Sequence, residues 1–417
     1  MAAELRRASR HPSREQRSGR HRCARASADR CLAQGSPASA DRPAGGLYPG
    51  RRGSGARPRR SRAHRSQERE PVSAREIDRL RGPILRSVSR SFYLSLRVLP
   101  RPLRDPLSLA YLLARATDTI ADTPEPPLDV RIEALRNLAG VIQGNTRLEA
   151  VAALRDSFGP LQKNEAERAL IGALPGALQW LELLEESDRR EVRDVLKKIN
   201  QGQTLDLEWF GTGTSTSTRT STSTSTSIRA LRTAGDLDVY TYLVAGCVGE
   251  FWTRLCFAHV RNFSGQTELE MRELGVRYGK GLQLINILRD AGSDLRAGRC
   301  YLPADQLHSL GLKPEDVLAK PAIVEPIMRD WREKAEGAMV SGIDYACAIK
   351  SRRVRFATAL PALIGARTLT LLREAGPAVF ARTVKVPRAE VRKMMLSATF
   401  ASPVSLRATF DGLRSRP

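Results

Sequence analysis

An apolar period of three and four residues runs from Ser73 to about Ala375, and it constrains the fold more than any other feature. This spacing places apolar side chains on one face of an α-helix. Prolines such as Pro100, Pro102 and Pro124 cluster at the joints, as helix boundaries prefer. The sequence lacks strand alternation and hairpin signals, so it predicts an all-α fold. We expect helices at residues 74–88, 103–122, 133–143, 165–185, 188–209, 237–258, 268–289, 325–350 and 355–373.

Three segments flank or interrupt the helical pattern. Residues 1–72 are rich in Arg, Ser, Gly and Pro, and we expect a disordered N-terminal extension that cannot bury enough apolar surface to fold. Residues 211–227 alternate Thr and Ser, which favours a low-complexity insertion between two helices. We therefore assign residues 73–380 to a single large domain and residues 381–417 to a short basic C-terminal tail.

Composition bounds the location and the partners. The six cysteines form no Cys-x-x-Cys pair, which favours a reducing, cytoplasmic setting. No stretch of 18 apolar residues exists, so we expect no transmembrane helix. Much of the net charge of +23 lies in the extension, and a non-catalytic nucleic-acid-binding protein is the alternative from a different class. No recognised nucleic-acid motif accompanies these arginines, so no nucleic-acid partner is expected.

Two long apolar segments each carry a polar stripe. Tyr111, Arg115, Asp118 and Asp122 follow one another at steps of four, three and four residues among leucines and alanines. These steps keep the four side chains on one side of a helix. A helix that is otherwise apolar would leave these charges desolvated unless the stripe lines a cavity.

A second stripe occurs about 170 residues later. Gln283, Asn286, Asp290 and Asp294 are spaced by three, four and four residues, with Arg289 beside them. Four carboxylates that face one another repel unless cations lie between them. Hard cations with oxygen ligands, Mg²⁺ above all, fit this arrangement and would bridge to diphosphate oxygens. The arginines would neutralise a departing diphosphate.

Five motifs make the chain resemble the squalene/phytoene synthase family over about residues 75–375. They are Ser89-Arg90-Ser91-Phe92, Tyr111 to Asp122, Tyr240 to Gly249, Gln283 to Asp294, and Arg299 to Pro303. The resemblance implies one all-α domain of the isoprenoid synthase type around a deep central cavity. It also implies a prenyltransferase of the farnesyl-diphosphate farnesyltransferase type.

The resemblance also implies roles for individual residues. The expected Mg²⁺ ligands are Asp118, Asp122, Asn286, Asp290 and Asp294. The expected diphosphate-binding residues are Ser89, Arg90, Ser91, Phe92, Arg115, Gln283, Asn286, Arg289, Arg299 and Tyr301. The expected catalytic residues are Tyr111, Arg115, Asp118, Tyr240 and Asp290. Tyr240 is a candidate for proton handling, with plain core packing as the alternative. Gly246 and Gly249 are expected to allow close helix packing.

The implied reaction joins two prenyl diphosphates head to head through a cyclopropyl diphosphate. Asp118-Thr119 and residues 359–369 favour squalene, made from two farnesyl diphosphates through presqualene diphosphate with NADPH as reductant. Residues 299–303 and Asp305 resemble a bacterial branch shared with phytoene synthases. A phytoene synthase acting on two geranylgeranyl diphosphates is therefore an alternative, as is a bacterial enzyme that performs one half of squalene formation. The partners expected are prenyl diphosphates, together with peripheral association at the inner membrane surface for product release.

Overall fold

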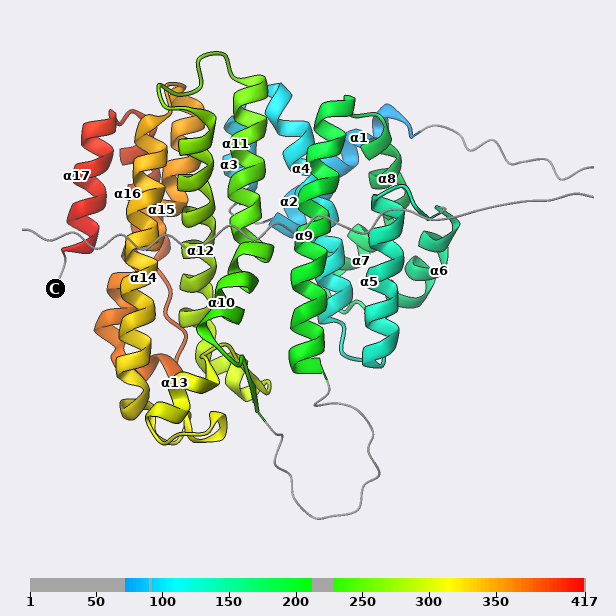
Figure 1. Cartoon of the computed structure of the whole chain (residues 1–417). Helices are drawn as coiled ribbons and strands as arrows, with labels where there is room; N and C mark the ends of the chain where they lie inside the picture. Colours follow the sequence, from blue (N-terminus) through cyan, green and yellow to red (C-terminus); the bar gives the residue numbers. More distant parts are fainter. Residues whose placement is uncertain (1–71, 90–91, 147, 212–227, 416–417) are drawn as a thin grey trace, which may run out of the picture. The chain divides into compact units, whose positions relative to one another are not determined.

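A computed structural model describes residues 72–89, 92–146, 148–211 and 228–415. Within these ranges the chain is almost entirely helical, and the longest helices run side by side (Figure 1). The all-α prediction is confirmed. The expected extension, apart from Val72, and the Thr/Ser segment, apart from Gly211, lie outside the described residues.

The elements follow one another with short connections. The α-helices are α1 (Ala74–Arg79), α2 (Leu85–Ser89), α3 (Phe92–Val98), α4 (Arg101–Asp122), α5 (Leu128–Ile142), α6 (Glu149–Phe158), α7 (Glu165–Gly172), α8 (Leu174–Glu182), α9 (Glu186–Phe210), α10 (Ala234–Thr241), α11 (Cys247–His259), α12 (Glu268–Arg296), α13 (Ala304–Ser309), α14 (Pro321–Ala348), α15 (Arg352–Ala375), α16 (Arg388–Thr399) and α17 (Pro403–Arg414). Tighter or wider helical turns are η1 (Leu80–Ile84), η3 (Tyr242–Gly246), η4 (Pro314–Asp316) and η5 (Gly376–Phe380). The strands β1 (Arg229–Ala230) and β2 (Arg299–Cys300) form one parallel pair.

Side-chain caps fix several helix starts. The Ser73 hydroxyl accepts a hydrogen bond from the Glu76 backbone N–H at 3.2 Å, as the sequence predicts. Thr267 and Glu270 form a reciprocal capping box at the start of α12. Such caps satisfy backbone N–H groups that have no partner within the helix.

Two predicted helices are divided in the structure. Residues 165–185 form α7 and α8, which meet at Ala173. Pro175 explains the break, because its ring clashes with the carbonyl of residue 171 in a continuous helix. Residues 237–258 run through α10, η3 and α11, so the helical path continues there with one wider turn.

Glycines bring α11 and α12 close together. A Cβ atom added to Gly249 would lie 1.9 Å from the Gly275 carbonyl oxygen, and one added to Gly246 would lie 3.0 Å from the Lys280 side chain. The prediction that Gly246 and Gly249 allow close helix packing is confirmed. α12 also packs along α14 and α15, which makes it a central helix of the fold.

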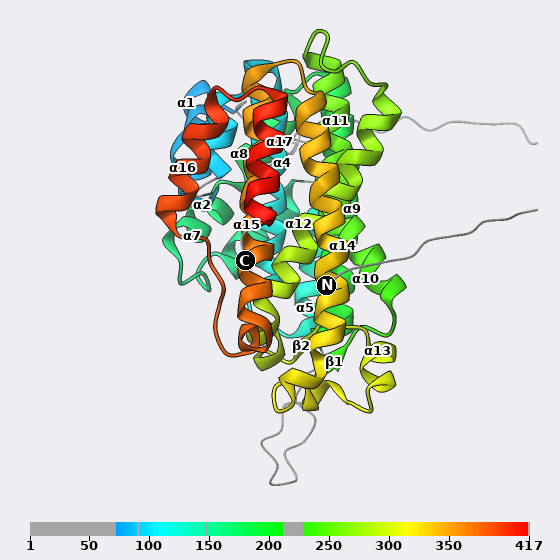
Figure 2. The same ribbon diagram turned by 90° about the vertical axis from the view of Figure 1, so that its left-hand side faces the viewer.

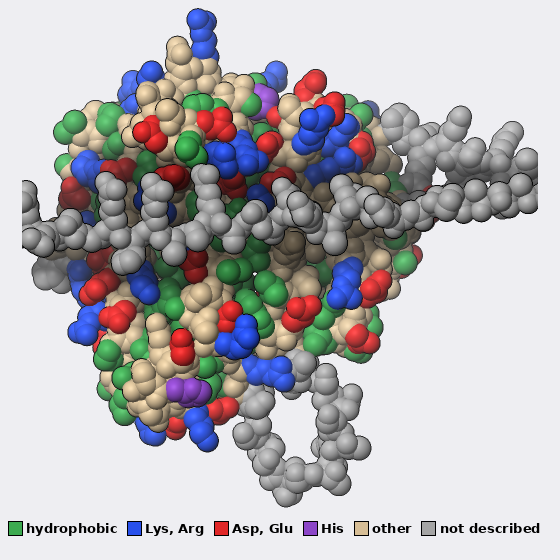
Figure 3. All heavy atoms as spheres, in the orientation of Figure 1, with side chains coloured by type: hydrophobic (Ala, Val, Ile, Leu, Met, Phe, Trp, Pro, Cys, Tyr) green, Lys and Arg blue, Asp and Glu red, His purple; other side chains and the backbone are tan. Residues whose placement is uncertain are grey.

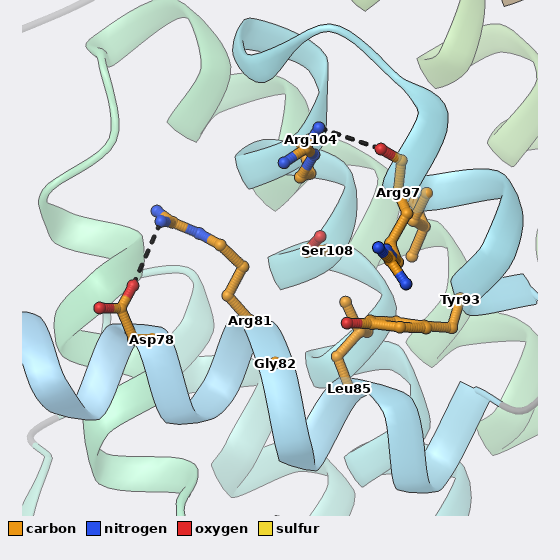
Figure 4. Close-up of a pocket in the computed structure, with 9 residues that line it drawn as sticks. Asp78, Arg81, Gly82, Leu85, Tyr93, Arg97, Arg104 and Ser108 are labelled. Atoms are coloured by element: carbon orange, nitrogen blue, oxygen red, sulfur yellow. Dashed lines mark hydrogen bonds and ion pairs between the residues drawn. The ribbon is translucent and has the colours of Figure 1, made fainter.

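The first helices are fastened to α4 by arginines. Arg81 of η1 forms an ion pair with Asp105 of α4 at 2.6 Å. Arg104 donates to the carbonyl oxygens of Arg97 and Leu99, at 3.0 and 2.9 Å. Figure 4 shows these arginines around a hollow at the N-terminal half of α4. The aspartates of α4 lie at the other end of that helix.

The segment expected as a short basic C-terminal tail is mostly helical. It forms α16 and α17, which pack against α15 (Figure 2). The side chains of Met394, Ala398, Leu406, Phe410 and Leu413 are buried there. They recur at three- and four-residue steps within each helix, a period that continues the pattern of the preceding helices. Among the described residues, no helix has both the length and the apolar character needed to cross a bilayer.

Candidate active site

Two helices present the predicted aspartate pairs. Asp118 and Asp122 lie at the C-terminal end of α4, where Leu112, Leu113 and Ala116 are fully buried on the opposite side of the helix. Asp290 and Asp294 lie in the last two turns of α12. The apolar faces fix how each helix rotates in the core, so the polar stripes point away from it.

Arg299 links the two aspartate pairs. It follows α12 and pairs with Asp294 at 3.2 Å. Its charge also interacts with Asp122 at the end of α4 and with Asp206 of α9. Three carboxylates from three helices therefore lie within electrostatic range of one guanidinium group.

The short parallel strand pair holds Arg299 in this place. The backbone N–H of Arg229 donates to the Gly298 carbonyl at 3.0 Å, and that of Leu231 donates to the Cys300 carbonyl at 3.1 Å. These bonds fix the backbone on both sides of Arg299. The strand pair joins segments 70 residues apart, and the sequence did not predict it.

The remaining aspartates of the pairs also have arginine partners. Arg115 forms ion pairs with Asp118 and with Glu167 of α7, the second at 2.5 Å. Arg289 donates to both oxygens of Asp290, at 2.9 and 2.5 Å. Glu167 was not predicted as a site residue, because it lies 52 residues from Arg115 in an unremarkable surface-like pattern.

The acids of the site hold protons more strongly than free carboxyl groups. Burial raises the pKa of Asp118 to about 6, and the charge of Asp122 adds to this rise while Arg115 opposes it. Burial also raises the pKa of Asp294 to about 6 against the charge of Arg299. The Asp122 pKa is raised mainly by desolvation as well. The site therefore carries a concentration of negative charge that a cation would relieve.

The donor set fits a hard cation that is shared with a substrate. Carboxylate oxygens are the ligands that Mg²⁺ prefers, and Mg²⁺ commonly keeps oxygens of water and phosphate in its shell. Within the described ranges, no three His, Cys, Asp or Glu side chains gather closely enough to enclose a metal by themselves. Substrate or water oxygens would thus have to complete the coordination of any ion bound between the aspartate pairs.

Asp206 is a buried site residue that the sequence analysis missed. The Tyr301 hydroxyl donates to its carboxylate at 2.5 Å. Burial raises the pKa of Asp206, and the charge of Asp122 contributes to that rise. Asn200, Gln203 and Asp206 follow one another at steps of three on α9, and this polar stripe is the sequence signal that could have revealed it.

An aromatic group surrounds Asp206. The rings of Tyr240 and Tyr301 stack with centroids 5.3 Å apart, and Trp209 and Phe210 meet them edge to face. Burial, together with the charge of Asp206, raises the pKa of Tyr240. Both tyrosine hydroxyls are therefore protonated at neutral pH. Tyr240 and Tyr301, which were predicted separately, lie together.

Other predicted residues lie around this centre or outside the described part. The Tyr111 hydroxyl donates to the Val88 carbonyl at 3.2 Å, and the Ser89 hydroxyl donates to the Leu85 carbonyl at 2.5 Å. Asn286 is exposed and its amide donates to Gln283 at 3.4 Å. Arg90, Ser91 and the side chain of Phe92 lie outside the described residues.

Hollows adjoin the carboxylates. One is lined by Thr119, Asp122 and Glu167. Another lies beside Asp294, Arg299 and Tyr301, with apolar walls from Ile287, Ala291, Leu295 and Leu302. Charged groups thus border apolar surface, which suits a molecule with an anionic head and a hydrocarbon chain.

Comparisons with known proteins agree with this geometry. A family model described as squalene/phytoene synthase matches residues 85–390. The squalene synthase of Saccharomyces cerevisiae is 27% identical over 225 residues, which is 53% of this chain and 44% of that protein. The presqualene diphosphate synthase of Rhodopseudomonas palustris is 26% identical over 309 residues, covering 73% of this chain and 89% of that protein.

Some relatives are much longer than the matched part. The bifunctional lycopene cyclase/phytoene synthase of Phaeosphaeria nodorum is 28% identical over 256 residues, which is 60% of this chain and 38% of that protein. The chain thus spans well under half of the length of several curated relatives that it matches. Among solved structures, a complex of TcSQS with the ligand BPH1237 has a TM-score of 0.64 at 18% identity, covering 81% of this chain and 90% of that one. This likeness supports the fold.

Proposed function

Because the chain belongs to the squalene/phytoene synthase family, we propose that it condenses two prenyl diphosphates head to head through a cyclopropyl diphosphate. The preferred substrates are two farnesyl diphosphates, which give presqualene diphosphate and then squalene. The observation that carries this proposal is the meeting of aspartate pairs from α4 and α12 around Arg299.

The charged groups suit the departure of a diphosphate. Mg²⁺, held by Asp118, Asp122, Asn286, Asp290 and Asp294, would neutralise the diphosphate and promote its release. Arg115, Arg289 and Arg299 each pair with a site carboxylate. Their guanidinium groups can move to the diphosphate oxygens once a cation satisfies those carboxylates. Ser89, Arg90, Ser91, Phe92 and Gln283 complete the proposed diphosphate-binding set.

The aromatic group suits the carbocation. Rings attract a cation through their faces, and apolar walls keep out the water that would capture it. Tyr240 and Tyr301 stack beside Arg299, and the hollow next to them has apolar walls. The hydrocarbon parts of both substrates are therefore proposed to lie against this group, with Tyr111 on the α4 side.

Closure of the cyclopropyl ring releases a proton, and Tyr240 is our candidate for handling it. Its raised pKa keeps the phenol protonated, so it acts as a relay and not as a permanent phenolate base. Its oxygen accepts the proton of the substrate carbon while its own proton passes on through hydrogen bonds. Asp206, which receives a hydrogen bond from Tyr301, lies next along that path.

A second candidate stops at presqualene diphosphate. The relative named presqualene diphosphate synthase matches 73% of this chain, a larger share than the yeast squalene synthase does. In that case no reductant is needed. NADPH is needed when the cyclopropyl intermediate is reduced to squalene, and a phytoene synthase would take geranylgeranyl diphosphate instead.

The test is product identification by mass spectrometry with purified protein. Farnesyl or geranylgeranyl diphosphate is supplied with Mg²⁺, with and without NADPH. We expect presqualene diphosphate from farnesyl diphosphate alone and squalene when NADPH is added. Presqualene diphosphate under both conditions supports the second candidate, and phytoene identifies the C20 alternative. Absence of any condensation product from either substrate would overturn the proposed reaction.

A further inference from the structure

Large exposed apolar side chains gather at the connection between α16 and α17. Leu396, Phe400 and Val404 are 75%, 80% and 79% exposed, more than any other large apolar residue of the described chain. They lie within nine residues of one another. Apolar side chains scattered singly on a surface need no explanation, but a cluster marks an interaction site.

The outward face of α16 changes from cationic to apolar along its length. Arg388, Arg392, Leu396 and Phe400 follow one another at steps of four residues, and all four are exposed. Residues four apart are neighbours on a helix surface. Met394 and Ala398 are buried on the other side of the helix. The two arginines therefore lie on the shaft of α16, and the apolar side chains lie at its end.

A second basic segment meets the apolar end. Lys350, Arg352, Arg353 and Arg355 surround the start of α15. The Arg352 guanidinium carbon lies 5.9 Å from the centroid of the Phe400 ring. The thiol of Cys347, at the end of α14, also reaches the Pro403 carbonyl at 3.3 Å. The α14–α15 connection and the α16–α17 connection therefore form one corner of the fold (Figure 2).

This corner has a strong excess of positive charge. Residues 376–404 contain five Lys or Arg and one acid, Glu390, which is paired with Arg367 at 2.8 Å. Residues 349–356 add four Lys or Arg and no acid. By contrast, basic and acidic side chains are interspersed on the face seen in Figure 3.

We propose that this corner, formed by the basic residues around 350–355 and the α16–α17 connection, docks on an anionic phospholipid surface. The lysines and arginines contact lipid phosphates, and Leu396, Phe400 and Val404 insert between the headgroups. An apolar tip with a cationic rim is the pattern of interfacial membrane binding. A second copy of the chain is a poorer occupant, because two corners of the same strong charge repel each other. The inference does not depend on the proposed reaction.

The first test measures binding of the full chain to vesicles by flotation. Vesicles contain phosphatidylglycerol with phosphatidylcholine, or phosphatidylcholine alone. The patch variant carries Leu396→Ser, Phe400→Ser and Val404→Ser. The matched control carries Leu183→Ser, Leu269→Ser and Ile323→Ser, three apolar residues that are 61%, 63% and 47% exposed elsewhere. The Arg-rich N-terminal segment is present in every protein compared, so its attraction to lipid cancels.

We expect the patch variant to bind anionic vesicles about tenfold more weakly or less, since it loses three insertable side chains. The control should bind like the unaltered protein, and neutral vesicles should bind little of either. Thermal unfolding of both variants checks that the fold is kept. Equal vesicle binding by patch and control variants would overturn the proposal.

A second measurement does not require removal of the patch. Phe400→Trp places a fluorescent ring at the proposed insertion point, and its emission is compared with that of the unaltered protein on vesicles with brominated acyl chains. Additional quenching in the variant supports insertion, and equal quenching overturns it. Light scattering with the lipid-free protein gives the remaining outcome. A dimer that the patch variant dissociates would assign the corner to a second copy and overturn the lipid proposal.

Discussion

Replacing Asp290 by Asn distinguishes a catalytic role of the second aspartate pair from a structural one. Asp290 accepts two hydrogen bonds from Arg289, and the two side chains are 34% and 33% exposed. An ion pair this open to solvent contributes about 0–1 kcal/mol to stability. The neighbouring acid Asp294 repels Asp290, which lowers the net contribution further. We therefore expect Asp290→Asn to change the free energy of unfolding by at most about 1 kcal/mol.

The effect on turnover should be much larger. A charge that stabilises a departing diphosphate in a secluded site contributes about 3 kcal/mol to the transition state. That corresponds to a loss of about two orders of magnitude in kcat. The assay is product formation from farnesyl diphosphate at saturating substrate and Mg²⁺, with denaturant unfolding measured on the same preparations.

Asp316→Asn is the matched control. Asp316 pairs with Lys320 at 3.2 Å and is 34% exposed, like Asp290, but it lies in η4 outside the site. Its replacement should leave both turnover and stability nearly unchanged. Near-normal turnover of Asp290→Asn would refute the role of the second pair. Lowered stability with unchanged kinetics would show that Asp290 is structural.

Three further changes test the fold and the electrostatics of the site. Gly249→Ala should destabilise the protein by about 1–3 kcal/mol in denaturant unfolding, because the new Cβ meets backbone of α12; Gly337→Ala, whose Cβ would meet nothing within 4 Å, should not destabilise. Phe410→Ala, at a fully buried position of α17, should cost about 3–5 kcal/mol. The exposed Phe400→Ala should change stability by less than about 0.5 kcal/mol, and equal effects of the two would contradict the packing of α17. Since the folded-state pKa of Asp118 is raised from 3.8 to about 6, the metal-free protein binds more protons than its unfolded chain in that window and loses stability as pH rises through it. Asp118→Asn should therefore show a smaller fall in melting temperature between about pH 4 and pH 6 than the unaltered protein; identical pH profiles would contradict the raised pKa.

The helices and the two aspartate stripes could be predicted from the sequence because both depend on local spacing. The steps between Tyr111 and Asp122, and between Gln283 and Asp294, define one helix face each, whatever surrounds the helix. The roles of Gly246 and Gly249 followed in the same way from small residues on an apolar helix. The division between α7 and α8 was also available locally, because Pro175 carries the signal.

The C-terminal helices show the limit of reading charge before period. The many Lys and Arg residues between 381 and 417 suggested a tail. The buried residues of α16 and α17 nevertheless recur at helical steps. The charges belong to the solvent-facing side of those helices, and the apolar side binds to α15.

The composition of the site beyond the two stripes was decided only by tertiary structure. Asp206 meets Tyr301 across 95 residues, Arg115 meets Glu167 across 52, and Arg299 is held by a strand that follows the Thr/Ser segment. Spacing along the chain fixes which side chains share a helix face, because the helix repeat is set by the backbone. It does not fix which faces meet, because that depends on how all the apolar faces pack at once.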